Sequence, residues 1–148
     1  MARILLLDDS PTQTFCMRRQ LQSLRHEVCH VGALSEALDL LAAKVATEGA
    51  TAMKREPFDL ALVELTLLED NGFDVGLGLL RAGVSKVLLL SGARRATDDI
   101  WARALGLQGV VSRPLTAQRL GAGIADGLAG ALTGALSEVL SGGGSDVH

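Results

Sequence analysis

The sequence predicts an α/β domain built on a doubly wound, five-stranded parallel sheet. Three observations indicate this class: short apolar runs recur along the chain, a helical pattern follows each of them, and most of the runs stop at a polar or charged residue. A continuous apolar run is typical of a strand that is buried on both faces. Alternation of such strands with helices requires crossover connections between parallel strands. The 148 residues are enough for one domain with its own core.

The predicted strands are short and largely apolar, and they are spaced widely enough for a helix to fit between each pair. They comprise residues 4–7, 27–31, 60–63, 87–90 and 110–111.

Capping residues and apolar spacing predict the helices. Ser10 followed by Pro11 is typical of an N-cap and the first helical position. Residues 35–54 have a helical composition, and Phe73 begins a third helical pattern. Thr97 and Thr116 are the predicted N-caps of the last two helices.

Charge and cysteine content exclude several classes of function. The net charge is -3 and no basic stripe is present, which argues against a nucleic-acid partner. The two cysteines, Cys16 and Cys29, are too few for a disulfide framework or a metal knuckle. The apolar run near the N-terminus is too short for a signal peptide and ends in two acids, so we expect a cytoplasmic protein.

Polar residues follow the predicted strands and should meet at one edge of the sheet. They are Asp8, Asp9, Glu64, Ser91 and Arg113. In open parallel sheets the functional crevice lies outside the carboxyl ends of the strands. Three acids placed together repel one another unless a cation is present. The cluster therefore predicts either a divalent metal such as Mg²⁺ or a guanidinium partner from Arg113.

Four motifs, in chain order, resemble those of response-regulator receiver domains: ILLLDDSPT, DLALVEL, LLLSGA and GVVSRP. The spacing agrees, since Gly72 lies 8 residues past Glu64 and Arg113 lies 22 past Ser91. The resemblance covers residues 2–128 and implies a CheY-like, flavodoxin-like (βα)5 fold. It also implies a module of two-component signalling rather than an enzyme, with a kinase or an output protein as its partner.

The sequence departs from that pattern at the centre of the site. Glu64 stands where the resemblance implies a phosphoacceptor aspartate, and misplacement of a reacting group by about 1 Å can cost about 100-fold in rate. Arg113 replaces a lysine, and its planar fork suits a carboxylate better than a point charge does. Val110 replaces an aromatic switch residue, and Leu68 replaces a proline.

These departures favour a pseudo-receiver, a phosphorylation-independent interaction module that requires no cofactor. Two alternatives stay open. One is an Mg²⁺-dependent phosphotransfer receiver that uses another carboxylate, such as Asp8 or Asp9. For that case the resemblance implies Asp9, Glu64 and the Thr66 carbonyl as metal ligands. The other alternative is a small enzyme on the same fold, since fold does not fix function.

Beyond residue 128, residues 129–140 are predicted to extend the last helix, and residues 141–148 form a flexible tail. Leucine or isoleucine recurs every four residues, a stripe that requires burial. Glycines in the same segment permit close helix approach, so we expect a homodimer through the last helix. Charged residues interrupt the stripe, which argues against a membrane span. The stripe consists of Leu120, Ile124, Leu128, Leu132, Leu136 and Leu140.

Residues 42–56, between the second and third predicted strands, are a predicted insertion relative to the receiver pattern.

Overall fold

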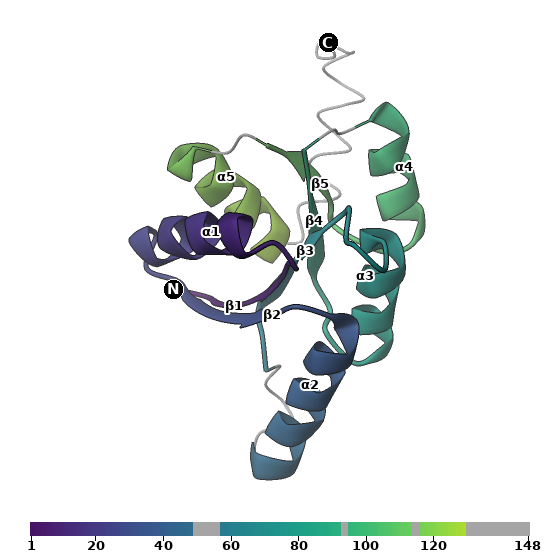
Figure 1. Cartoon of the computed structure of the whole chain (residues 1–148). Coiled ribbons are helices and arrows are strands. Elements are labelled where there is room, and N and C mark those ends of the chain that lie inside the picture. Colours follow the sequence, from purple (N-terminus) through teal and green to yellow (C-terminus); the bar gives the residue numbers. More distant parts are fainter. Residues whose placement is uncertain (49–56, 93–94, 114–115, 130–148) are drawn as a thin grey trace.

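The computed structural model describes residues 1–48, 57–92, 95–113 and 116–129. In this part of the chain the strands form one five-stranded parallel sheet in the order β2-β1-β3-β4-β5 (Figure 1). The sheet confirms the predicted fold class. Its strands are β1 (Arg3–Leu7), β2 (Glu27–Val31), β3 (Leu60–Glu64), β4 (Val87–Ser91) and β5 (Gly109–Ser112).

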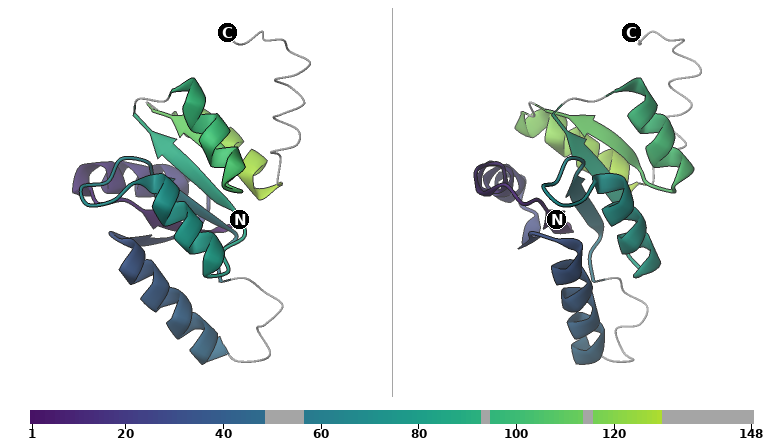
Figure 2. Two further views of the ribbon diagram at one scale, coloured as in Figure 1. Left: turned by 90° about the vertical axis from the view of Figure 1, so that its right-hand side faces the viewer. Right: turned by 45° about the vertical axis from the view of Figure 1, so that its right-hand side comes forward.

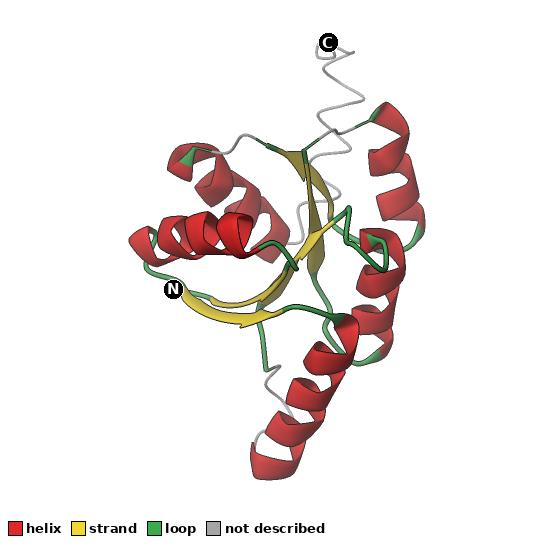
Figure 3. Cartoon of the chain, viewed as in Figure 1, coloured by secondary structure: helices red, strands yellow, loops and turns green. Residues whose placement is uncertain are grey.

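Helices cover both faces of the sheet, as Figures 2 and 3 show. Helices α1 and α5 pack on one face, and α2, α3 and α4 pack on the other. This is the layered arrangement that right-handed crossovers between parallel strands produce. The helices are α1 (Pro11–Ser23), α2 (Leu34–Glu48), α3 (Gly72–Arg81), α4 (Ala96–Ala104) and α5 (Ala117–Leu128).

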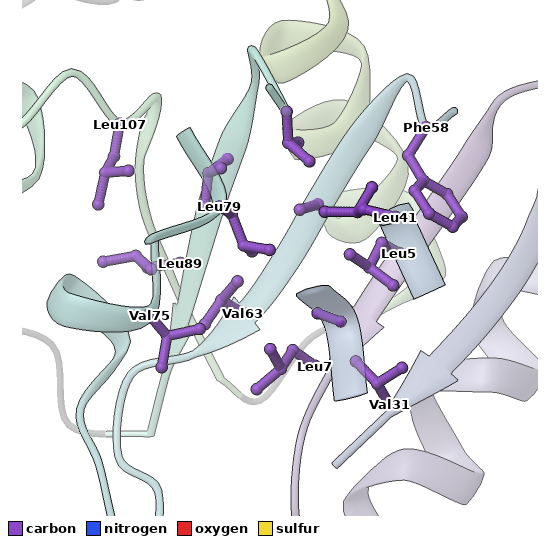
Figure 4. Packing of buried hydrophobic residues seen from close by; sticks show 14 of the residues in the cluster. Leu5, Leu7, Val31, Leu41, Phe58, Val63, Val75, Leu79, Leu89 and Leu107 are labelled. Atoms are coloured by element: carbon purple, nitrogen blue, oxygen red, sulfur yellow. The ribbon is translucent and has the colours of Figure 1, made fainter. Parts of the chain in front are cut away.

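The central strands alternate their side chains between two apolar clusters, which explains why their sequences are continuously apolar. Leu5 and Leu7 of β1 face the cluster under α2, α3 and α4, much of which is shown in Figure 4. Ile4 and Leu6 face the opposite cluster, under α1 and α5. All four side chains are fully buried. Burial of each such side chain is worth about 1.5 to 3 kcal/mol, so the core supplies the main driving force for the fold.

Two of the predicted caps are confirmed and one is wrong. Ser10 accepts a hydrogen bond from the backbone N–H of Gln13, and Thr116 caps α5 in the same manner. Helix α4 begins earlier than predicted, at Ala96, with Arg95 rather than Thr97 as its N-cap. The Asp98 carboxylate accepts a hydrogen bond from the Arg95 backbone N–H at 2.9 Å, so the helix start is satisfied from within the first turn.

The predicted helix over residues 35–54 is observed as α2, which ends at Glu48. Residues 49–54 of that prediction, and residues 49–56 of the insertion, lie outside the described residues. Helix α5 ends at Leu128, where the sequence predicts an extension. The Lys86 ammonium donates to the Leu128 carbonyl and so satisfies a carbonyl at the helix end. Residues 130–148, which hold the rest of the extension and the tail, are not described.

Helix α5 uses the first part of its leucine stripe within its own domain. Leu120 and Ile124 are buried in the core, and Leu128 packs against it. A Cβ at Gly127 would lie 3.3 Å from Leu60, so the glycine allows α5 to approach β3 closely. No described helix is both long enough and apolar enough to span a membrane.

The connection from β3 to α3 is closed by backbone contacts that only glycine permits at one position. The Gly72 N–H donates to the Leu65 carbonyl at 2.7 Å, and Thr66 forms a bridge with Asn71. A Cβ at Gly72 would lie 2.7 Å from the Leu65 Cα and 2.9 Å from the Glu64 carbonyl oxygen. Both distances are below any normal contact, and the atoms involved are backbone atoms that cannot rotate away.

We therefore expect Gly72→Ala to lower the free energy of unfolding by about 1 to 3 kcal/mol, the usual cost of overpacking. Gly92→Ala is the matched control, because a Cβ there meets no atom within 4 Å. Urea denaturation of both variants measures the difference. Equal stability of the two would contradict the close approach at Gly72.

Candidate functional site

Polar side chains from four strands meet at the carboxyl edge of the sheet. Asp8 directly follows β1, and Arg113 directly follows β5. Glu64 and Ser91 are the last residues of β3 and β4. Asp8, Glu64 and Ser91 are buried, with 1%, 5% and 3% of their surfaces exposed. The topology therefore brings these four predicted residues to one edge, two of them ionisable and almost fully removed from water.

Arg113 reaches across the end of β4 to pair with two carboxylates. Its Nη1 contacts Glu64 Oε1, and its Nη2 lies 3.7 Å from Asp8 Oδ2. The Arg113 backbone N–H donates to the Ser91 carbonyl at 2.8 Å, which fixes the start of the side chain beside β4. Only 16% of the arginine side chain is exposed. One guanidinium therefore joins the ends of β5, β3 and β1.

The carboxylate and the carbonyl of Asp8 are both held in place. Its Oδ1 accepts a hydrogen bond from the Ser10 backbone N–H at 2.9 Å. Its carbonyl oxygen lies 2.8 Å from His30 Nε2, and a carbonyl can only accept, so this ring nitrogen carries the hydrogen. Thr14 Oγ1 lies 3.3 Å from the same nitrogen. His30 is a residue that sequence reasoning missed, because its position depends on the pairing of β2 with β1.

The Asp9 carboxylate has a different hydrogen-bond partner from those of Asp8. Its Oδ2 accepts a hydrogen bond from the Leu68 backbone N–H at 2.7 Å, which ties the end of β1 to the β3–α3 connection. Leu68 itself is 89% exposed. Asp9 is thus turned towards the loop, while Asp8 faces the guanidinium.

The side chains, as they lie, do not fit a divalent cation. Of the implied ligands, Glu64 already contacts Arg113, and Asp9 is engaged by the Leu68 N–H. The Thr66 backbone also hydrogen-bonds the Glu64 carboxylate. Within the described ranges, no three histidine, cysteine, aspartate or glutamate side chains are placed to hold a metal ion.

Burial dominates the electrostatics of both buried carboxyls. Desolvation raises the pKa of Glu64 above its ordinary value, although the Arg113 charge and hydrogen bond oppose the rise. Desolvation likewise raises the pKa of Asp8, against the opposing effects of the Ser10 hydrogen bond and of Arg113. Each carboxyl would be more strongly shifted without the guanidinium, because a nearby positive charge favours the ionised form.

The comparisons with known proteins agree with the fold. No family model matches the chain. The structure of Vibrio cholerae chemotaxis protein CheY4 has a TM-score of 0.67 and 21% identity, and covers 86% of this chain and 98% of its own. The BeF3-activated receiver domain of Klebsiella pneumoniae RstA has a TM-score of 0.68 and 17% identity, and covers 85% and 97%.

The chain therefore has the fold of the CheY-like receiver domains. Among curated proteins it is similar to Protein PilH of Pseudomonas aeruginosa, with 26% identity over 123 residues. That match covers 81% of this chain and 92% of PilH.

The ion pair generates a stability prediction for Arg113→Met. At about pH 7 the variant should lose about 3 kcal/mol in the free energy of unfolding, because two buried carboxylates lose their counter-charge. A carboxyl whose folded-state pKa is raised destabilises the fold when ionised and ceases to do so when protonated. The deficit should therefore shrink as the pH falls from about 7 through the raised pKa values of Asp8 and Glu64.

Denaturant titrations of the wild type and the variant at several pH values measure this deficit. Arg81→Met serves as the control, because it also removes one positive charge, but from an exposed side chain in the last turn of α3. A deficit that stays constant with pH would show that Arg113 acts through packing rather than through its charge.

Proposed function

We propose that this receiver domain is a phosphorylation-independent interaction module, a pseudo-receiver that binds another signalling protein. The observation that carries the proposal is the buried pair between Glu64 and Arg113 at the acceptor position. Receiver domains act on other signalling proteins, and the partner here would be a kinase or an output protein. The two free cysteines, Cys16 and Cys29, are consistent with a reducing compartment such as the cytoplasm.

Phosphoryl transfer to Glu64 is disfavoured on geometric and electrostatic grounds. The attacking oxygen must lie in line with the leaving group, and little beyond positioning and charge is available for catalysis. The longer glutamate side chain changes that position. One of its oxygens also contacts the guanidinium, and the residue is 5% exposed. A carboxylate engaged in this way is a poor nucleophile.

The same pair supports a built-in substitute for the phosphorylated state. Glu64 carries its charge one methylene further out than an aspartate does, and Arg113 meets it there. Glutamate has fewer acceptor oxygens and less charge than a phosphoryl group, so the substitution is partial. In this proposal the arrangement of β4 and β5 around Arg113 stays in one state and does not alternate with phosphorylation.

In the alternative function, phosphotransfer, Asp9 is the carboxylate best placed to accept the phosphoryl group. Asp8 is 1% exposed and is held by Ser10 and Arg113, whereas Asp9 is partly exposed. A working receiver would therefore accept the phosphoryl group on Asp9, after release of the Leu68 N–H. A small enzyme on this fold has no specific observation in its favour.

Incubation with Mg²⁺ and acetyl phosphate, followed by intact-mass measurement, tests the proposal. We expect the wild type to keep its mass, and Glu64→Asp combined with Arg113→Lys to gain one phosphoryl group, because the pair restores the implied acceptor and its point-charge partner. A gain in the wild type that Asp9→Asn abolishes would establish the alternative.

We also propose a homodimer through the segment that follows α5. Leu120 and Ile124 are buried within the domain, so the unexplained part of the stripe is Leu132, Leu136 and Leu140. These residues lie outside the described part of the chain, and the support comes from their spacing of four residues, which is typical of an apolar helix face.

A chain that stops after Ala129 should be monomeric, whereas the full-length chain should be dimeric by light scattering. The cut is placed there because a cut after Leu120 would remove Ile124 from the core. Leu136→Glu in the full-length chain is the matched variant and should also give a monomer, since a charge cannot be buried unpaired. A monomeric wild type at high micromolar concentration would contradict the dimer.

A further inference from the structure

We infer that the Arg113 guanidinium is the resident cation of this site and excludes divalent metal ions from it. The inference rests on the proposed function and deepens it, since it names what replaces the metal that a phosphotransfer site needs. Three acids sit at the carboxyl edge of the sheet, and such a group is stable only beside a positive charge. Arg113 supplies that charge from within the chain.

Arg113 contacts two of the three clustered acids, and one of them, Glu64, is an implied metal ligand. Nη1 contacts Glu64 Oε1, and Nη2 faces Asp8 Oδ2 at 3.7 Å. Apart from the pairing with Arg113, these two carboxylate oxygens are buried and have no hydrogen-bond partner in the described structure. The two oxygens therefore depend on this one guanidinium for their compensation.

The third acid is withdrawn from the cluster by the backbone. Asp9 Oδ2 accepts the Leu68 N–H at 2.7 Å, within a connection that the Thr66–Asn71 bridge closes. Mg²⁺ requires near-ideal octahedral oxygen ligands at about 2.0 to 2.1 Å. A metal ion at Glu64 would therefore compete with Arg113 for the carboxylate, and one of the two Asp9 oxygens is already engaged by the Leu68 N–H.

Competition favours the arginine because it is tethered and permanently charged. An arginine guanidinium stays positively charged in proteins, so it remains a counter-charge for the two carboxylates. Its backbone is fixed to the Ser91 carbonyl at 2.8 Å, so the guanidinium is always present at high effective concentration beside Asp8 and Glu64. A metal ion in solution must displace this group before it can bind.

Removal of Arg113 should therefore convert the site into one that responds to metal ions. The experiment titrates Mn²⁺ and Mg²⁺ into the full-length wild type, Arg113→Ala and Arg81→Ala, by calorimetry and by the shift in thermal unfolding temperature. Arg81→Ala is the control for the loss of one positive charge. We expect Arg113→Ala to bind Mn²⁺ at least tenfold more tightly than either other protein, and to be the protein whose unfolding temperature rises most with the metal.

A second substitution locates the binding. Glu64→Gln added to Arg113→Ala should return the affinity to the wild-type level, because it removes one of the released carboxylates. Should Arg113→Ala fail to fold by circular dichroism, Arg113→Gln takes its place, since the amide keeps hydrogen-bonding capacity without the charge.

Two outcomes would overturn the inference. One is a wild type that binds Mn²⁺ as tightly as the Arg113 variant does. The other is tighter binding in the variant that survives Glu64→Gln. Neither outcome decides the proposed function, which is judged by the mass of the wild type after acetyl phosphate treatment. Metal binding by a wild type that takes no phosphoryl group would reject the resident cation and keep the interaction module.

Discussion

Charge compensation at the carboxyl edge of the sheet is the constraint on which the arrangement of the site depends. The parallel topology places Asp8 and Glu64 at the ends of two central strands, where they are 1% and 5% exposed. Burial of two carboxylates is costly unless a positive charge is close. Arg113 lies at the end of the edge strand β5 and reaches both of them. One side chain thereby joins the end of β5 to Asp8 and Glu64, and its backbone is bonded to the end of β4.

Asp9, next to Asp8 in the chain, has a structural role instead of a contact with Arg113. Asp9 binds the Leu68 N–H and joins β1 to the β3–α3 connection, whose close approach at Gly72 holds the chain beside the Glu64 backbone. Asp8 is meanwhile held by Ser10 and, through its carbonyl, by His30. The acidic pair therefore divides between two roles: one acid faces the guanidinium and the other fixes a loop.

The sequence was sufficient to predict the fold and four residues of the cluster, because both follow from strand order and from residues at strand ends; the fifth predicted residue, Asp9, is turned towards the β3–α3 connection instead. It could not predict that Arg113 would also face Asp8 rather than Asp9, since that depends on side-chain direction at the end of β1. His30 was missed because its partner, the Asp8 carbonyl, is backbone. The helix α4 start was misplaced by two residues because Asp98 satisfies the backbone of Arg95 from inside the helix. The leucine stripe was interpreted as evidence for a homodimer, and its first residues, Leu120 and Ile124, belong to the domain's own core.

The ion pair is better understood as a device for position than as a source of stability. The apolar clusters on the two faces of the sheet provide the driving force for folding, and a buried pair often contributes little beyond what apolar residues of the same size would give. Apolar side chains in place of Asp8, Glu64 and Arg113 would fill the same space but would not require one fixed orientation of the strand ends. The guanidinium and the carboxylates do impose one, because their attraction requires a defined meeting of Nη1 and Nη2 with two separate oxygens. This directional requirement supports the proposal that the site holds one arrangement of the strand ends for recognition by a partner.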